Sequence, residues 1–258
     1  MLDKQGLRLS SEFGSTEQAG TFQENKVTPI HGWFPYTEGY SSRLIKSIID
    51  GSEHKLDLIL DPFGGSATTG VETIFSGSCY HGYDINPAMK IVADAKTVSG
   101  AYLNRALTTG KITPRRFNDL VEKIAESRAR SPILNQVFFD KPYFSASNLR
   151  QIDNIRQNID AYVDDVHLHN VFLGALLSIL VNVSNLKRSP DLKYRDEKDW
   201  ARPSAVGEFR KKCRQILSDL LSFRPAANPG RANNYVGTDL PPELGQRNLE
   251  SHRVFFSV

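Results

Sequence analysis

Two acids and a group of small residues lie close together in the sequence and have the chemistry to bind a polar ligand. Asp61 ends a short apolar run at residues 56–60, and Asp84 ends a second short predicted strand at residues 79–83. Short apolar runs that end in an acid are typical of buried parallel strands. The turn after the first acid contains Gly64, Gly65, Ala67 and Gly70. Such a turn before a helix lets the backbone approach a ligand at the helix N-terminus.

The chemistry of this turn favours one class of ligand. No Gly-Lys-Ser/Thr sequence follows, so the turn is not a Walker A loop, and its glycine spacing does not fit G-x-G-x-x-G. Asp61 directly precedes the turn, where its charge would repel a pyrophosphate but attract the amine and sulfonium of S-adenosylmethionine (AdoMet). Asp84 is placed to accept hydrogen bonds from ribose hydroxyls. AdoMet is the predicted cofactor, but spacing alone does not distinguish it from NAD, and a nicotinamide-dependent oxidoreductase is the alternative.

The elements that must position these residues follow from the spacing of apolar residues. A helix is predicted after the turn, ending at Gly77, so that strand, turn, helix and strand form one βαβ unit. An earlier helix is capped by Ser41 or Ser42 and ends near Ile49. Residues 224–234 are predicted to form a loop. The remaining predicted helices lie near residues 87–98, 114–129, 146–162, 165–186 and 204–222, and strand ends lie near 235–239 and 252–258.

Composition excludes several classes of protein. Of 258 residues, 40% are hydrophobic and 24% are charged, which is typical of a globular chain and not of a disordered one. Cys79 and Cys213 are the only cysteines and lack the spacing of metal ligands, which predicts a reducing cytoplasm. The N-terminus lacks the apolar region of a signal peptide. Residues 171–181 are the longest apolar run, shorter than the roughly 20 residues that span a bilayer, so no membrane association is expected.

Four segments together resemble one family. Residues 61–69, DPFGGSATT, are similar to the D-P-F-x-G-S-G-T-T signature of amino-group DNA methyltransferases, which methylate cytosine N4 or adenine N6. Residues 82–87, GYDINP, resemble the acidic second motif of that family, and residues 31–41 resemble the aromatic segment that precedes the first motif. Residues 236–239 are similar to its G-D-A/S segment. The resemblance implies an α/β, Rossmann-like AdoMet-dependent methyltransferase fold with a large helical insertion.

The resemblance also implies which residues bind the cofactor. The aromatic segment would close over the methionine end of AdoMet, and the acid of the fourth segment would contact its adenine ring. The implied AdoMet contacts are Trp33, Tyr36, Gly39, Tyr40, Ser41, Asp61, Phe63, Gly65, Ala67, Thr68, Thr69, Asp84, Ile85, Asn86 and Asp239. A purely structural turn, and a core role for the aromatic segment, are the alternatives.

Two departures from the family pattern concern binding and catalysis. Ala67 replaces the usual third glycine, and its methyl group could crowd the cofactor. The family's catalytic [D/N/S]-P-P-[Y/F/W] motif binds and stacks on an extruded base, but Pro241 and Pro242 are flanked by Leu240 and Glu243. Neither cysteine follows a proline, as the nucleophile of a cytosine-C5 enzyme would. No catalytic residue is therefore predicted in this chain.

The motif order predicts four segments. They are a flexible arm at 1–28, an AdoMet-binding βαβ region at 29–100, a helical insertion at 101–225, and a return to the sheet at 226–258 that stops before the catalytic motif. The chain is thus expected to be the cofactor-binding part of a split or truncated DNA methyltransferase of restriction–modification or phage defence, completed by a second polypeptide. The alternative is an inactive relic that binds AdoMet or DNA.

A basic segment suggests where DNA would bind. Residues 187–214 contain ten basic and five acidic residues, interleaved with Tyr194 and Trp200. Basic residues with interspersed aromatics suit phosphate contact with occasional base stacking; a solvated helix face is the alternative. The predicted DNA contacts are Lys187, Arg188, Lys193, Arg195 and Arg202.

Overall fold

A computed structural model describes residues 21–36, 39–52, 55–126, 142–188, 192–196, 201–224 and 229–237, together with the backbone of a strand at 254–256. The chain divides into two compact units. Residues 1–101 with 223–258 form one, which we call the sheet unit, and residues 102–222 form the other, the helical unit.

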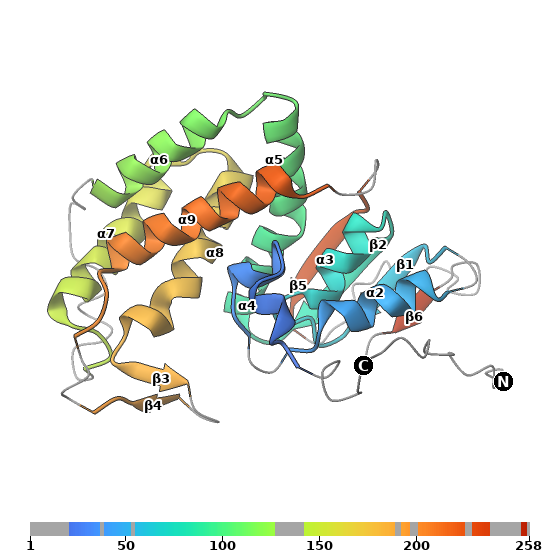
Figure 1. The fold of residues 1–258 in the computed structure, drawn as a ribbon, viewed down its shortest axis with the longest axis horizontal. Coiled ribbons are helices and arrows are strands. Elements are labelled where there is room, and N and C mark those ends of the chain that lie inside the picture. The colour runs from blue at the N-terminus through green and yellow to red at the C-terminus, as the bar shows by residue number, and fades with distance from the viewer. Residues whose placement is uncertain are drawn as a thin grey trace. The chain divides into compact units, whose positions relative to one another are not determined.

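The sheet unit is built on four parallel strands (Figure 1). These are β1 (Leu58–Asp61), β2 (Cys79–Asp84), β5 (Ala232–Val236) and β6 (Val254–Phe256), in the spatial order β5-β2-β1-β6. Leu58 of β1 pairs with Cys79 of β2 on one side and Val254 of β6 on the other. The strands therefore follow the order 3-2-1-4, which is that of the first four strands of a Rossmann sheet. In such sheets ligands bind at the carboxyl ends of the strands, where the order reverses. Here the reversal lies at β1.

Short helices accompany these strands in the sheet unit. They are η1 (Glu24–Lys26), η2 (His31–Trp33), α2 (Ser42–Asp50), α3 (Thr68–Phe75), α4 (Pro87–Lys96) and the first residues of α5 (Val98–Thr108). α2 and α3 lie side by side in front of the strands (Figure 1). Ser41 and Asn86 cap α2 and α4 through their side-chain oxygens, and a proline follows the second cap.

Tyr80 of β2 fills the space between the sheet and α3, and two glycines make room for it. A Cβ added at Gly82 would lie 2.3 Å from the Tyr80 hydroxyl oxygen, and one at Gly70 would lie 2.7 Å from the Tyr80 ring. The Tyr80 side chain is fully buried. These glycines are therefore required by close packing under the turn.

The helical unit contains the rest of α5, then α6 (Pro114–Glu126), α7 (Ala146–Tyr162), α8 (Val166–Val183) and α9 (Ala205–Ser222). Phe172 of α8 lies between Phe117 of α6 and Phe209 of α9, with ring centroids 5.1 and 6.3 Å away. By length and composition, α8 is the one helix in the described part of the chain that could cross a membrane. It packs against α7 and α9, and its buried residues recur at helical spacing, as in the core helix of a bundle.

Three buried asparagines join the helices of this unit. Asn158 of α7 donates to the Ile124 carbonyl near the end of α6 (2.8 Å), and Asn104 of α5 donates to the Leu220 carbonyl near the end of α9 (2.7 Å). Asn148 of α7 donates to the Val183 carbonyl at the end of α8 (3.0 Å) and accepts from the Ala205 N–H at the start of α9 (3.1 Å). Helix ends leave backbone groups without intrahelical partners, and these side chains satisfy them.

Several elements differ from the sequence-based expectations. The helix predicted over 165–186 ends at Val183, because a hairpin follows: β3 (Leu186–Arg188) pairs antiparallel with β4 (Leu192–Tyr194). α5 was not predicted, and β5 begins within the predicted loop at 224–234.

The N-terminal arm predicted to reach residue 28 also differs from the structure. Phe22 and Asn25 are buried, and Asn25 bonds the Tyr40 carbonyl (2.9 Å) and the Ser42 N–H (2.9 Å). Residues 22–28 are thus part of the packed sheet unit.

Candidate cofactor-binding site

The turn after β1 is held to the end of β2 by its own backbone. Gly65 and Ala67 both have left-handed backbones, with φ of 47° and 59°. The Gly64 N–H donates to the Tyr83 carbonyl (2.7 Å), and the Ala67 N–H donates to the Gly64 carbonyl (2.7 Å). A left-handed conformation costs a non-glycine residue about 1–2 kcal/mol. The Ala67 side chain is fully buried, so its methyl group faces protein and not solvent.

Asp84, the last residue of β2, binds the backbone of the turn through its carboxylate. Its Oδ2 accepts from the Gly65 N–H (2.9 Å), and its Oδ1 accepts from the Asn86 N–H (2.8 Å). A carboxylate offers about four lone-pair sites, so both oxygens can accept further hydrogen bonds. Ile85, the next residue, is 79% exposed. The end of β2 thus presents an acid with acceptor capacity beside an apolar surface.

Asp61 lies deeper, at the end of β1, and is only 2% exposed. It accepts hydrogen bonds from the Phe63 N–H (3.0 Å) and the Tyr40 hydroxyl (3.2 Å), and the Tyr40 hydroxyl also bonds the Thr69 side chain. Burial raises the pKa of Asp61, while hydrogen bonds from Thr69, Phe63 and Tyr40 oppose that rise. This acid links the aromatic segment to the start of α3.

Some side chains of the aromatic segment, residues 31–41, lie at the turn, and others lie in the core. The ring of Tyr36 lies over Gly65, where an added Cβ would be 3.2 Å from Tyr36 Cε1. Trp33 is only 3% exposed, and its ring approaches Gly100 at the start of α5. Gly39 is buried beside Phe22, where a Cβ would be 2.7 Å from the ring. Tyr36 therefore reaches the turn, whereas Trp33 has the surroundings of a core residue.

The structure therefore brings together many of the residues that the resemblance implies. Tyr36, Tyr40, Asp61, Gly65, Thr69 and Asp84 meet around the turn. Thr68 is buried at the start of α3, Ser41 caps α2, and Phe63 is 78% exposed. Asp239 lies outside the described residues.

Lys96 is a site residue that the sequence reasoning missed. It ends α4 and is buried, and its Nζ donates to the Ser66 carbonyl within the turn (2.5 Å). A lysine in the last turn of a helix usually faces solvent, so its type and position gave no signal of this contact.

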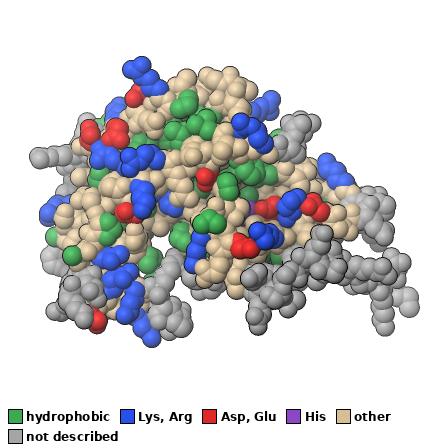
Figure 2. Space-filling view, in the orientation of Figure 1, with side chains coloured by type: hydrophobic (Ala, Val, Ile, Leu, Met, Phe, Trp, Pro, Cys, Tyr) green, Lys and Arg blue, Asp and Glu red, His purple; other side chains and the backbone are tan. Residues whose placement is uncertain are grey.

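The basic residues predicted to contact DNA fall into two groups. Lys187 of β3 and Lys193 of β4 are directly opposite one another and exposed, in a region where Lys and Arg side chains gather (Figure 2). Arg195 donates to the Leu186 carbonyl (3.1 Å), and Arg202 donates to the Asn182 carbonyl (3.0 Å). The two arginines therefore bond backbone carbonyls beside the hairpin. The side chain of Arg188 lies outside the described part.

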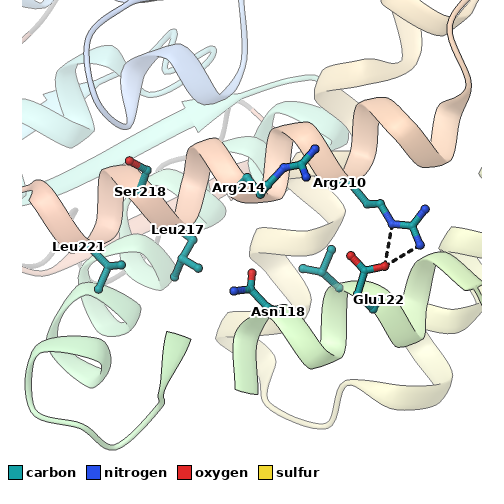
Figure 3. A pocket seen from close by; sticks show the side chains of 8 residues that line it. Asn118, Glu122, Arg210, Arg214, Leu217, Ser218 and Leu221 are labelled. Atoms are coloured by element: carbon teal, nitrogen blue, oxygen red, sulfur yellow. Dashed lines mark hydrogen bonds and ion pairs between the residues drawn. The ribbon is translucent and has the colours of Figure 1, made fainter. Parts of the chain in front are cut away.

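Two hollows occur away from the turn. One, of about 330 Å³, lies in the sheet unit against α2 and the C-terminal half of α3. The other, of about 430 Å³, lies between α6 and α9, where Arg210 reaches Glu122 (Figure 3). Neither is lined by a residue predicted to bind cofactor or DNA. Within the described ranges, no group of three or more His, Cys, Asp or Glu residues could hold a metal ion.

Comparison with known proteins identifies the family. A family model described as DNA methylase, for N6 and N4 methyltransferases, matches residues 11–94. Through this segment the chain is similar to the amino-group DNA methyltransferase family. The match contains the aromatic segment, the turn and Asp84, so the resemblance found in the sequence is confirmed.

Two curated relatives of this chain extend the comparison. Type II methyltransferase M.BsoBI of Geobacillus stearothermophilus is 40% identical over 78 residues, which are 30% of this chain and 15% of that protein. Type II methyltransferase M.MvaI of Kocuria varians is 24% identical over 233 residues, which are 86% of this chain and 50% of that protein. The chain thus spans half or less of the length of these relatives. No solved structure matches it significantly.

Proposed function

We propose that this chain is the AdoMet-binding part of a DNA methyltransferase that modifies an exocyclic base amine, cytosine N4 or adenine N6. The observation that carries the proposal is the turn itself. Asp61 and Asp84 end adjacent parallel strands at the point where the strand order reverses, and Tyr36 and Tyr40 lie over the intervening turn. Ligands of Rossmann-like sheets bind at this position.

The residues around the turn fit AdoMet. The carboxylate of Asp61 suits the cationic amine and sulfonium, and Asp84 retains acceptor capacity for ribose hydroxyls. Phe63 and Ile85 present exposed apolar side chains directly beyond β1 and β2, suited to the face of an adenine ring. When bound, AdoMet would supply a methyl group on an electrophilic sulfonium. The residues of this chain would bind and orient that donor.

The backbone of the turn disfavours the dinucleotide alternative. A pyrophosphate binds to free backbone N–H groups at such a turn. Here the N–H groups of Gly64, Gly65 and Ala67 already donate to the Tyr83 carbonyl, the Asp84 carboxylate and the Gly64 carbonyl. These three N–H groups are therefore not free to bind a pyrophosphate.

Methyl transfer also needs groups that residues 1–258 do not contain. These residues lack the catalytic [D/N/S]-P-P-[Y/F/W] motif, and we propose that a second polypeptide supplies it. The base would flip out of the duplex, and its amine would be held in line with the donor methyl, so positioning would provide most of the rate acceleration. The relatives are Type II methyltransferases, which supports a role in restriction–modification, and hence a cytoplasmic location.

The hairpin is the proposed DNA contact of this chain. Lys187 and Lys193 face each other across the two strands, and like charges directly opposite in a sheet repel. A phosphate lying between them would relieve that repulsion. Tyr194 is 43% exposed and stacks on Tyr143 with a centroid distance of 5.9 Å, which offers an aromatic surface beside the lysines.

Calorimetry with AdoMet and with NAD tests the cofactor assignment. We expect AdoMet to bind, and Asp84→Ala to weaken binding by at least about tenfold, since hydrogen bonds to a charged group contribute about 1.5–3 kcal/mol each. Asp50→Ala is the matched control, because Asp50 is an exposed acid of the same unit, paired with Lys46. Binding of NAD without AdoMet would overturn the proposal.

A methyl-transfer assay tests the need for a second polypeptide. With labelled AdoMet and duplex DNA, the purified chain should transfer no methyl groups by itself. Transfer by this chain alone would refute the two-part enzyme. A neighbouring reading frame that encodes [D/N/S]-P-P-[Y/F/W] would favour the two-part enzyme over an inactive relic.

A further inference from the structure

Lys96 is a buried hydrogen-bond donor that contacts the turn after β1, residues 62–67, which we call the cofactor turn. Its side chain is 1% exposed, and its Nζ lies 2.5 Å from the Ser66 carbonyl oxygen. Ser66 stands between Gly65 and Ala67, the two residues with left-handed backbones. The contact therefore fixes the most sharply bent part of the turn.

The surroundings of Lys96 suit a neutral amine better than an ammonium. An ammonium has three donors, and within the described residues Ser66 supplies the single acceptor that Lys96 bonds. No ion pair to Lys96 occurs within the described residues: Asp94 of the same helix bonds Lys90 and Asn234, and Glu72 bonds His31. Burial alone lowers the pKa of Lys96 to about 7.

The groups around Lys96 also favour a neutral amine over an ammonium. His31 of η2 is buried, and burial lowers its pKa, with the charge of Lys96 contributing in the same direction. A histidine is neutral or positively charged, so His31 supplies no counter-charge to an ammonium. The Ser66 hydroxyl is also buried and bonds none of the described residues, Lys96 included, so the Ser66 carbonyl stays the single acceptor that Lys96 bonds there.

We propose that Lys96 is a positioning residue for the cofactor turn: its neutral amine holds the Ser66 carbonyl in the geometry that receives AdoMet, and protonation of the amine opposes that geometry. The inference rests on the proposed function and adds a proton linkage to it. Because binding selects the neutral form, AdoMet affinity rises with pH through neutrality, and binding below this range releases a proton.

The pH profile of AdoMet binding tests this role. Calorimetry at pH 6, 7 and 8 compares the wild type with Lys96→Met. This substitution removes the amine at nearly constant side-chain volume. The amine of AdoMet titrates in both proteins, so the difference between them isolates Lys96. We expect the ratio of wild-type to variant affinity to rise by up to about tenfold from pH 6 to pH 8, because the neutral fraction of an amine with a pKa of about 7 rises from about one tenth to about nine tenths over this range.

Lys90→Met is the matched control, because Lys90 lies on the same helix and is partly exposed. It should keep the wild-type pH profile. A Lys96→Met variant with the same profile as the wild type would overturn the proposal. Failure of the wild type to bind AdoMet at any pH would instead refute the proposed function, and with it this inference.

A second measurement covers the case in which Lys96→Met does not fold. The side-chain carbon resonances of ¹³C-labelled lysine report the protonation of Lys96 in the wild type, and Lys96→Arg assigns the signal. We expect titration near neutrality in the free chain and at lower pH with AdoMet bound. Titration near the ordinary lysine range, or no shift on binding AdoMet, would overturn the proposal.

Discussion

Replacing the two hairpin lysines together, Lys187→Gln with Lys193→Gln, should reduce the salt dependence of DNA binding. Both side chains are exposed and directly opposite one another, and neither has an acidic partner within the described residues. Each phosphate contact contributes about 0.9 to the slope of log affinity against log salt. If each lysine contacts one phosphate, the slope should fall by about 1.8.

This change of slope converts into a measurable difference in affinity. Between 50 and 200 mM salt, the wild type should lose about tenfold more affinity than the double variant. Fluorescence anisotropy with a labelled duplex of mixed sequence, over a series of salt concentrations, measures both slopes without requiring AdoMet or methyl transfer.

A control of equal charge separates local contact from net charge. Lys111→Gln with Lys123→Gln removes the same charge from the helical unit, where these lysines lie over the rings of Tyr102 and Tyr162. This control should keep the wild-type slope. An equal fall of slope in both double variants, or an unchanged slope in the hairpin variant, would refute the proposed phosphate contacts.

Three further predictions concern stability and are measured by urea unfolding. Gly82→Ala should destabilise by about 1–3 kcal/mol through overpacking, because its Cβ would lie 2.3 Å from the Tyr80 hydroxyl oxygen; a wild-type midpoint would contradict this packing. Asn148→Ala should cost about 2–4 kcal/mol, since it leaves buried helix-end groups without partners, whereas exposed Asn118→Ala should be nearly neutral. Burial lowers the Lys96 pKa from 10.5 to about 7, so the unfolded chain binds more protons between these values. Stability should then rise by up to about 1.4 kcal/mol per unit over that window, and Lys96→Met should remove the rise.

The sheet and its turn were largely predictable because their geometry restricts the residues allowed. β1 and β2 are short, buried and end in acids, and Asn86 with Pro87 marks the start of α4. Asp61 and Asp84 could be placed together because strands of a parallel sheet bring their carboxyl ends to one edge, and Tyr40 was added by the resemblance to the family. Local sequence and global topology agree in this region.

The parts that were missed have weak local signals. α5 begins one residue after α4, separated by Thr97 and without a glycine or proline between them. The hairpin strands contain three residues each, which is too short for their alternation to be seen. Lys96 and Trp33 took their positions from packing against residues distant in the sequence, and no local pattern encodes that.

The hydrogen bond from Asn104 to Leu220 has a consequence for how the chain is organised. Asn104 lies just after the chain enters the helical unit, and Leu220 lies just before it leaves, 116 residues later. The two ends of this long excursion are therefore fastened to each other within the unit itself. Segments whose ends meet can be inserted into a host fold, or exchanged between relatives, without stretching the chain on either side. The hydrogen bond of the Asn104 amide thus holds the two ends of the helical unit together, as in a segment that can be inserted or exchanged as a whole.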